Sequence, residues 1–449
     1  MSECLIQHLN RRVFFDPDTL GIRLPDITGP VQDHHYSEIK AGSDDSHELK
    51  NSAVMSTLSI NIAQTCNLNC TYCYAGQGTY GNAGKMSAST GRESIDWLVN
   101  QGENIREFSI NFFGGEPLLR YSTLKDLVSY AEQKKQNGSF LFHYSITTNG
   151  SLISQSIIDF FKTYDFAVNV SIDGTRALHN KQRPFLNGEG SYDMVAKNIK
   201  KLLAAGVRVS ARATIMDQTP EEEIFESLRS LGLEQITVTN ASVSRFVSTL
   251  PGTGKVNDSG TAADPVKALP LSGQKLQSEA DLFYELVGSR RVNELKKLKL
   301  SSKLYKNIFS LLSGKKRGRF CGAGQNYAGV SSQGKVYLCH RFVGMDDYQL
   351  GTVLSSGSKL KTIGNLAEES VPTVSKCTSC YAKNLCGGGC YHDNLGKTGS
   401  IFEQDEKDCK EVRQAAKIAI DLVARLTDQD KDFLEEFNII VTKFCPLDL

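Results

Sequence analysis

Apolar and polar positions repeat along residues 57–240 as short strand patterns separated by longer helical patterns. The strand patterns alternate apolar with polar residues or are rich in β-branched residues, and six of them follow one another. They are Thr57–Ala63, Glu107–Phe113, Leu141–Thr148, Phe166–Ser171, Val207–Ile215 and Gln235–Thr239. Repeated strand–helix units predict a parallel sheet covered by helices. Because six units are too few to close an eight-stranded barrel, we predict an α/β fold with an open, partial (β/α)6 barrel at residues 55–240.

The residues around this barrel divide into four further segments. Residues 1–54 contain one short strand pattern, Val13–Phe15, and are otherwise polar, which predicts a partly flexible N-terminal extension. Residues 241–320 begin with a flexible loop rich in Gly, Ser, Thr and Pro and continue with the apolar spacing of bridging helices. Residues 321–412 hold seven cysteines, and residues 413–449 are predicted to form a helical tail.

The overall composition is that of a soluble globular enzyme. The chain has 449 residues, of which 40% are hydrophobic and 22% charged, and a formal net charge of +1. This balance, without a basic and aromatic patch, favours neither a nucleic acid nor a membrane as partner. No apolar run has the length of a membrane span, and Met1–Asn10 lacks the order of a secretory signal, so we expect a cytoplasmic protein. Ten of the twelve cysteines fall in two groups, which in a reducing compartment indicates metal ligation rather than disulfides.

The first cysteine group, Cys66, Cys70 and Cys73, directly follows the first predicted strand. Active sites of parallel α/β barrels lie at the carboxyl ends of the strands, so this is the position of a functional loop. Structural zinc sites and fully protein-ligated iron–sulfur cubanes take four protein ligands. Three thiolates on a tight loop therefore leave one metal position open, as catalytic metal sites do. A zinc loop and a chance group of thiols are the alternatives.

The C-x3-C-x2-C spacing, with Tyr72 before the last cysteine, resembles the motif of the radical S-adenosylmethionine (SAM) superfamily. In that superfamily a 4Fe–4S cluster on the three cysteines binds SAM at its open iron, and its electron cleaves SAM to a 5′-deoxyadenosyl radical. Three later stretches at strand ends resemble further SAM-binding segments. They are Gly114-Gly115-Glu116-Pro117, Thr147-Thr148-Asn149-Gly150 and Ser171-Ile172-Asp173-Gly174.

The resemblance implies a set of cofactor contacts at these strand ends. Its members are Tyr72, Gly114, Gly115, Glu116, Pro117, Asn149 and Ser171. Glu116 would bind the amino group of SAM, since a carboxylate accepts hydrogen bonds from an ammonium group. The paired glycines would let the backbone approach the ligand closely. Arg183 is a candidate partner of the SAM carboxylate, or else a surface arginine that pairs with an acid.

The second cysteine group has the spacing C-x2-C-x5-C-x3-C at its centre. The group comprises Cys321, Cys339, Cys377, Cys380, Cys386, Cys390 and Cys409. This order resembles the SPASM domain, a carboxy-terminal module of radical SAM enzymes that modify peptides and proteins. The resemblance implies two auxiliary 4Fe–4S clusters, the first on Cys321, Cys339 and Cys390 and the second on Cys377, Cys380, Cys386 and Cys409. The first is then one ligand short, so either Cys445 or Cys4 completes it or an open iron faces the substrate. Zinc-ribbon pairs are the alternative.

His340 follows Cys339 directly and is a candidate base that removes a proton after hydrogen abstraction. In sulfatase-maturing relatives an aspartate stands in that neighbourhood, so the histidine argues mildly against their oxidation of serine or cysteine. The structural alternative is a histidine that donates to a cluster sulfur or to a backbone carbonyl.

Together the resemblances imply a radical SAM/SPASM oxidoreductase that modifies peptides. We predict that it cleaves SAM reductively with three 4Fe–4S clusters and installs a thioether, ether or C–C crosslink in a ribosomally synthesised precursor peptide. An external one-electron reductant of the flavodoxin or ferredoxin type is the expected second partner. The alternatives are maturation of a protein substrate of the sulfatase or dehydrogenase type, and a non-catalytic zinc-bound interaction protein. A complete winged-helix domain for leader recognition is not expected to fit before residue 57. Three alternatives for binding the leader peptide stay open: a reduced version of that domain, a separate protein, and the cationic helix at residues 283–300.

Overall fold

The structure is a computed structural model that describes residues 4–8, 11–23, 55–101, 105–137, 140–216, 219–241, 273–298, 300–354, 375–437 and 439. The chain forms two compact units. The barrel unit comprises residues 51–268 and 322–367, and the helical unit comprises residues 1–50, 269–321 and 368–449. In the part of the chain that the structure describes, no helix combines the length and the apolarity needed to cross a membrane.

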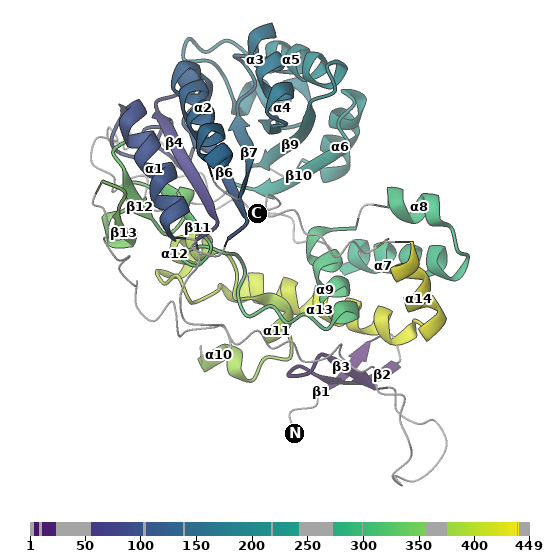
Figure 1. The fold of residues 1–449 in the computed structure, drawn as a ribbon. Coiled ribbons are helices and arrows are strands. Elements are labelled where there is room, and N and C mark those ends of the chain that lie inside the picture. The colour runs from purple at the N-terminus through teal and green to yellow at the C-terminus, as the bar shows by residue number, and fades with distance from the viewer. Residues whose placement is uncertain are drawn as a thin grey trace, which may run out of the picture. The chain divides into compact units, whose positions relative to one another are not determined.

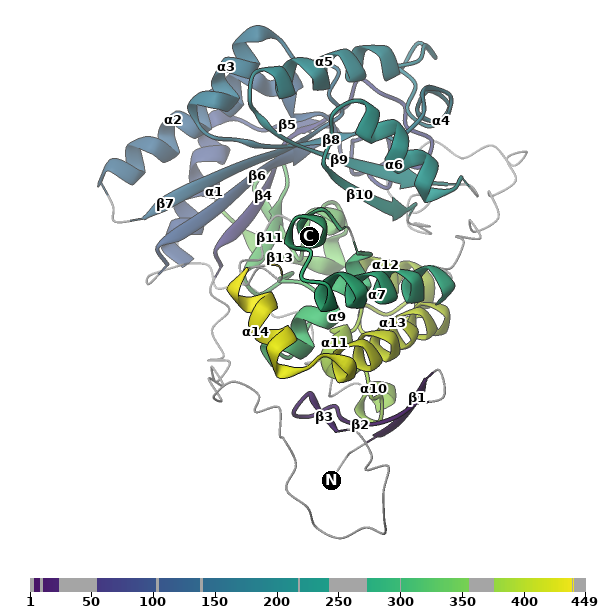
Figure 2. The same ribbon diagram turned by 90° about the vertical axis from the view of Figure 1, so that its right-hand side faces the viewer.

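Six parallel strands form the centre of the barrel unit (Figures 1 and 2). They are β4 (Thr57–Gln64), β6 (Glu107–Gly114), β7 (Leu141–Thr148), β8 (Ala167–Ser171), β9 (Arg208–Ile215) and β10 (Gln235–Asn240), and they lie side by side in sequence order. The ends of all six lie within one residue of the predicted strands. The predicted α/β fold with a parallel, partial barrel is therefore confirmed.

Helices cover one face of this sheet (Figure 2). They are α1 (Ala88–Gln101), α2 (Tyr121–Asn137), α3 (Gln155–Thr163), α4 (Arg176–Gln182), α5 (Tyr192–Ala204) and α6 (Glu221–Ser230), with a 3-10 turn, η1 (Pro117–Arg120), before α2. Their apolar faces and every second residue of the strands, such as Leu58, Ile60 and Ile62, form one core. Ser154 and Thr175 begin α3 and α4, since their hydroxyl oxygens accept hydrogen bonds from the first turn.

The opposite face of the strands, the inner face, carries polar residues. Ser59 and Asn61 alternate with the core residues of β4, and both are fully buried. Asn111 on β6 donates to the Ser59 hydroxyl at 3.3 Å, and the Ser145 hydroxyl on β7 donates to Asn111 at 3.3 Å. Closed (β/α)8 barrels fill their interior with branched apolar side chains. The polar inner face is instead suited to a ligand that makes hydrogen bonds.

Three strands that the sequence analysis did not foresee extend the sheet beyond β4. The first, β11 (Tyr327–Val330), pairs with β4 in parallel, and β12 (Lys335–Tyr337) and β13 (Gln349–Thr352) follow in antiparallel order. A two-residue strand, β5 (Gly84–Lys85), also pairs with β4. The 3-10 turns η3 (His340–Phe342) and η4 (Asp346–Tyr348) connect β12 to β13. As a result, Cys339 and His340 belong to the barrel unit.

The helical unit contains helices in the predicted bridging segment and in the predicted tail, and further short helices between them that the sequence analysis did not foresee. They are α7 (Gly273–Gly288), α8 (Val292–Lys297), α9 (Ser302–Ser313), α10 (Ser375–Thr378), α11 (Lys383–Cys386), α12 (Tyr391–Thr398), α13 (Glu406–Arg425) and α14 (Asp428–Glu436). The central helix α13 packs against α7 and α9, and its buried residues form a second core with them.

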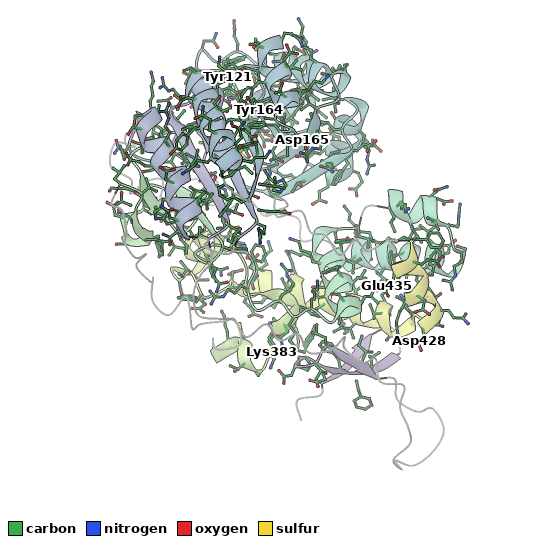
Figure 3. The ribbon with its side chains drawn as sticks, in the orientation of Figure 1. Tyr121, Tyr164, Asp165, Lys383, Asp428 and Glu435 are labelled. Atoms are coloured by element: carbon green, nitrogen blue, oxygen red, sulfur yellow. The ribbon has the colours of Figure 1, made fainter. Side chains whose placement is uncertain are left out.

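A small antiparallel sheet completes the helical unit. Its strands are β1 (Cys4–His8), β2 (Arg11–Asp16) and β3 (Gly21–Arg23), so the predicted strand at Val13–Phe15 is confirmed as part of β2. Val13 and Phe15 join the second core. Lys383 of α11 approaches this sheet and its ammonium group lies 2.5 Å from Asp18 (Figure 3).

Some predictions fall outside the described residues. These are the predictions for residues 24–54 of the partly flexible N-terminal extension, for most of the flexible loop that begins at residue 241, and for Cys445 as a cluster ligand. The predicted domain boundaries stay a prediction.

Candidate cofactor and metal sites

The first cysteine loop leaves the carboxyl end of β4 and is held by the last residue of α4 and the segment that follows it. The Asn69 N–H donates to the Pro184 carbonyl at 2.8 Å, and the Thr71 N–H donates to the Gln182 carbonyl at 2.9 Å. Cys66, Cys70 and Cys73, spaced through this loop, are all partly exposed. The structure thus places the three cysteines where the sequence predicted a functional loop, at the carboxyl edge of the sheet.

The Gly-Gly-Glu-Pro turn at the end of β6 packs directly on the start of this loop. The Gly115 N–H donates to the Ala63 carbonyl at 2.7 Å, and the Glu116 N–H donates to the Thr65 carbonyl at 2.9 Å. A Cβ atom on Gly115 would lie 2.3 Å from the Thr65 oxygen, and one on Gly114 would lie 2.1 Å from the Ala63 oxygen. Both glycines are therefore required by the close approach of two backbone segments.

Glu116 joins this turn to the next strand. Its fully buried carboxylate accepts hydrogen bonds from the Leu118 N–H at 3.0 Å, the Thr148 hydroxyl at 2.8 Å and the Asn149 N–H at 2.7 Å. Burial raises the pKa of Glu116 to about 7, against the effect of these three donors. Pro117 starts η1 directly after it. Glu116 thereby fixes the strand ends of β6 and β7 relative to each other.

Asn149 lies between the end of β7 and the cysteine loop. Its amide nitrogen donates to the Asn67 side chain at 2.9 Å and lies 3.8 Å from the Cys66 sulfur. Its oxygen accepts from the Ser151 hydroxyl at 2.7 Å. Ser171, at the end of β8, is half-buried. Both predicted residues therefore belong to the same edge of the sheet as the cysteines.

Asp173 is the centre of a buried network that holds Tyr72. The Tyr72 hydroxyl donates to the Asp173 carboxylate at 2.7 Å, and Arg183 Nε donates to it at 2.9 Å. The Arg183 guanidinium also lies 5.1 Å from the centre of the Tyr72 ring. Burial lowers the pKa of Arg183, but Asp173, Tyr72 and Cys70 together outweigh this effect and raise the pKa above its usual value, so the guanidinium stays charged. Arg183 thus pairs with an acid, as one of its two predicted roles required, in a buried rather than a surface position.

Sequence reasoning missed three residues of this network. Gln182 Nε2 donates to Asp173 at 2.9 Å, and the Asp173 N–H donates to His179 Nδ1 at 3.2 Å. The other nitrogen of His179 lies 2.9 Å from the Ser191 hydroxyl, and burial lowers the pKa of His179 to about 4. The available signal was Asp173 itself, a carboxylate at a predicted strand end beside Ser171.

The chemistry of the cysteine loop fits a metal group. Burial raises the pKa of the Cys66 thiol to about 12 and that of Cys70 to about 11, the latter opposed by Arg183. Thiolates at these positions therefore need further positive charge, which metal ligation supplies. Among the described residues no three His, Cys, Asp or Glu side chains are close enough to hold a single metal ion. In an iron–sulfur cubane each cysteine binds a different iron atom, so its ligands need not converge on one point.

His340 lies in an aromatic cluster beside this loop. Its ring centre is 4.6 Å from that of Phe113, the residue before the Gly-Gly turn, and 6.4 Å from that of Tyr74, the residue after Cys73. Its Nδ1 is hydrogen-bonded to the hydroxyl group of Tyr327 on β11. The structure therefore places the His340 ring close to residues that flank the cysteine loop, while its role as a base stays a prediction.

Four cysteines of the second group line one pocket in the helical unit. They are Cys377, Cys380, Cys386 and Cys409. The pocket holds about 480 Å³ of space, including the part open to solvent, and Lys376, Lys383 and Arg413 also line it. Burial raises the pKa of Cys386 to about 11. Four thiols and flanking cations are a donor set that fits a fully ligated, negatively charged cluster.

The remaining three cysteines are divided between the two units. Cys321 and Cys390 belong to the helical unit, where the loop after α11 packs on the residues before Cys321. A Cβ atom on Gly387 would lie 2.4 Å from the backbone of Arg319. Cys339 is a buried residue of the barrel unit and precedes His340. The proposed ligand set of the first auxiliary cluster stays a prediction.

Comparison with known proteins agrees with this arrangement. Residues 60–231 match the family model of the radical SAM superfamily. A cysteine-type anaerobic sulfatase-maturating enzyme of Clostridium novyi is 25% identical over 357 residues, which cover 75% of this chain and 88% of the relative.

Two solved structures have a similar fold. Native anSMEcpe with bound AdoMet and the Cp18Cys peptide superimposes with a TM-score of 0.61 at 19% identity, covering 86% of this chain and 99% of that chain. SuiB of Streptococcus suis, bound to the precursor peptide SuiA, superimposes with a TM-score of 0.51 at 17% identity, covering 79% of this chain and 76% of that chain. At these identities the similarity shows a common fold.

Proposed function

We propose that this chain, an enzyme with a radical SAM domain at residues 60–231, modifies peptides and installs a side-chain crosslink in a ribosomally synthesised precursor. The observation that carries the proposal is the presence of two cysteine sites in one chain. Three cysteines lie on the loop held by the Gly-Gly-Glu-Pro turn, and four others line one pocket. The second site is the kind of auxiliary site that the SPASM resemblance predicts for peptide-modifying enzymes.

SAM and a 4Fe–4S cluster on Cys66, Cys70 and Cys73 are the proposed cofactors of the barrel unit. Together they would supply a carbon radical that takes a hydrogen atom from an unactivated C–H bond of the substrate. The chain's own residues keep that loop in place: Glu116 fixes the turn that supports it, and Asp173 and Arg183 hold Tyr72 beside it. The polar inner face of the sheet offers hydrogen bonds to a peptide.

We also propose two auxiliary 4Fe–4S clusters, which makes three clusters and about twelve iron atoms per chain. The pocket lined by Cys377, Cys380, Cys386 and Cys409 supports one of them. Substitution Cys409→Ala should lower the iron content by about four atoms per chain. The same substitution should leave the binding of SAM intact, because Cys409 belongs to the helical unit and the loop of Cys66 to the barrel unit. An unchanged iron content would remove the second auxiliary cluster from the proposal.

A peptide substrate is supported by what the similar proteins bind. SuiB is bound to a precursor peptide and anSMEcpe to the Cp18Cys peptide. The name of the sulfatase-maturating relative describes an enzyme that modifies another protein, which supports a polypeptide as the substrate of this chain. A flavodoxin or ferredoxin would supply the single electron that starts each turnover.

The test is anaerobic co-expression with a short peptide encoded beside this gene, followed by mass spectrometry of the peptide. A crosslinked peptide should be lighter by two hydrogens, and cleavage of its backbone between the two linked residues should not release separate fragments. Alkylation of thiols before the measurement separates a thioether, which blocks a cysteine, from an ether or C–C bond. The matched control is Cys66→Ala, which should return the peptide unmodified. Cleavage of SAM with an unmodified peptide would contradict the proposal.

A second candidate is maturation of a sulfatase-type protein, which the 25% identity over 88% of the sulfatase-maturating relative favours. Oxidation of a serine to an aldehyde also removes two hydrogens, so mass alone does not separate the two reactions. An aldehyde reacts with a hydrazide probe and a crosslink does not. Co-expression with a sulfatase peptide, followed by hydrazide labelling, therefore distinguishes the candidates.

A further inference from the structure

Gln404 is a buried side chain in the pocket that Cys377, Cys380, Cys386 and Cys409 line. It is 8% exposed and comes shortly before α13, the helix that carries Cys409. Its side-chain oxygen lies 3.4 Å from the Cys386 sulfur, and its main-chain oxygen lies 4.0 Å from the Cys409 sulfur. One residue therefore reaches two of the four sulfurs, although the cysteine spacing did not indicate it.

The segment that carries Gln404 is held in place by its neighbours. Lys376 Nζ donates to the Gln404 carbonyl at 2.8 Å, and the Thr398 hydroxyl donates to the Glu403 carbonyl at 2.8 Å. A Cβ atom on Gly389, whose φ is +79°, would lie 3.0 Å from both Cδ and Nε2 of Gln404. The glycine thus leaves the space in which the amide lies, and the amide is packed against the pocket.

Binding of a cluster in this pocket changes what the Cys386 sulfur can do in a hydrogen bond. In this structure the Cys386 thiol donates to the Gln404 side-chain oxygen. A cysteine that binds iron has no such hydrogen, so its sulfur can only accept. The oxygen and nitrogen of a carboxamide have nearly the same size, and a half-turn about the last side-chain bond exchanges them. The amide nitrogen then lies where the oxygen lies now and donates to the sulfur.

The charges around the pocket give this hydrogen bond weight. Each of the three cations that line the pocket is paired with a carboxylate: Lys376 with Glu403 at 2.9 Å, Lys383 with Asp18 at 2.5 Å, and Arg413 with Glu406. The positive charge that they present to a cluster is therefore partly balanced. A hydrogen bond to a cluster sulfur stabilises the negative charge that reduction adds, and this raises the reduction potential.

We propose that the side chain of Gln404 donates an N–H hydrogen bond to the Cys386 sulfur of the second auxiliary cluster and raises the reduction potential of that cluster. The four cysteines hold the cluster, and Gln404 sets how readily it takes up one electron. This inference rests on the proposed function, because it needs the cluster in the pocket.

The potential is measured by redox titration of the complete reconstituted enzyme, followed by electron paramagnetic resonance. The signal that is absent from Cys409→Ala belongs to the cluster of this pocket. Gln404→Met removes the donor at nearly the same side-chain length. It should lower the ratio of reduced to oxidised cluster about tenfold at a given potential, a shift of about 59 mV for one electron. Gln404→Glu keeps the shape but places a carboxylate beside the sulfur, so it should lower the potential further.

Gln414→Met is the matched control, since Gln414 is an exposed glutamine of α13. It should leave the potential unchanged. A native potential in Gln404→Met, with the native iron content, would overturn the proposal.

Pulsed electron paramagnetic resonance tests the hydrogen bond in the native enzyme itself, labelled with ¹⁵N in its glutamine side chains. We expect a ¹⁵N coupling to the reduced cluster of the pocket, and we expect Gln404→Met to lose it. Because the native enzyme carries this measurement, it decides the question even if the methionine variant fails to hold the cluster. A native enzyme without the coupling would overturn the proposal.

The iron content separates this proposal from the proposed function. If the native enzyme holds about eight iron atoms and lacks the signal of this pocket, the second auxiliary cluster fails and the role of Gln404 fails with it. If the cluster is present and only the Gln404 results disagree, the failure belongs to Gln404 alone. Modification of the peptide is measured separately, so an unmodified peptide would leave the redox result standing.

Discussion

Gly115→Ala tests whether the Gly-Gly-Glu-Pro turn acts by supporting the cysteine loop. The added Cβ atom would lie 2.3 Å from the Thr65 oxygen, 2.6 Å from the Thr65 carbonyl carbon and 2.9 Å from the Gly78 oxygen. Carbon atoms in contact normally lie about 3.5–4.0 Å apart. All three opposing atoms belong to backbone, so the turn itself must move by about 1 Å.

The magnitude follows from what that movement breaks. Overpacking of this kind costs about 1–3 kcal/mol. The hydrogen bonds from Gly115 N–H to Ala63 and from Glu116 N–H to Thr65 are then weakened or lost, at about 0.5–1.5 kcal/mol each. We therefore expect a loss of about 2–6 kcal/mol in the free energy of unfolding. A displacement of about 1 Å at the cofactor site should also lower the rate of SAM cleavage about 100-fold.

The assay measures 5′-deoxyadenosine release by the reconstituted enzyme, together with urea unfolding. Gly206→Ala is the matched control, because Gly206 has a φ of +75° but nothing within 4 Å of an added Cβ atom. It should cost about 1 kcal/mol of stability through backbone strain alone and should keep SAM cleavage near the native rate. SAM cleavage by Gly115→Ala at the native rate would refute the reasoning. Equal losses of activity in both variants would also refute it, since the effect would then be general.

Three further substitutions test the buried groups of the barrel unit. Arg183→Met leaves the buried Asp173 without its ion pair and should lower the free energy of unfolding by about 3–5 kcal/mol. The control Arg176→Met removes an exposed ion pair and should cost under about 1 kcal/mol. Equal effects of the two substitutions in urea unfolding would contradict the burial of the pair between Arg183 and Asp173. Asn61→Leu removes a fully buried carboxamide whose two polar atoms have no partner among the described residues, and should raise the unfolding free energy by about 1–3 kcal/mol in urea titrations; a loss of stability would show that the amide is paired. The pKa of Glu116 is raised to about 7 from 4.5, so the folded state binds the proton more tightly, and this contribution to stability is complete below pH 4.5 and declines until about pH 7. Glu116→Gln lacks the titrating group, so the free energy of unfolding of the native enzyme should fall relative to that of the variant between pH 4.5 and 7. A difference between the two that stays constant across this window would contradict the raised pKa.

Much of the fold could be predicted from the sequence because its elements carry their own periodicity. The six parallel strands and their helices each present a regular apolar face, and the ends of β7 coincide with the predicted ones. The strands β11, β12 and β13 have three or four residues each and pair through partners distant in sequence, such as Tyr327 with Thr57. Local patterns of that length do not distinguish a strand from a loop.

The positions of the site residues were predictable, but their partners were not. The cysteine loop and the motifs at the ends of β6, β7 and β8 follow strands, so topology alone brings them to one edge. The sequence suggested a ligand as the reason for Gly115, whereas the structure shows a backbone carbonyl against it. Likewise, nothing in the spacing of Tyr327 and His340 indicated that the phenol bonds the ring, because that contact depends on the turn η3 after β12.

The most direct test of the account follows one hydrogen atom. The co-expressed peptide is prepared with fully deuterated side chains and incubated with the reduced enzyme and unlabelled SAM. The account predicts that the released 5′-deoxyadenosine gains one deuterium while the peptide loses it at the crosslinked carbon. Release of 5′-deoxyadenosine without deuterium, beside an unchanged peptide, would contradict the claim that the barrel holds a peptide carbon for hydrogen abstraction.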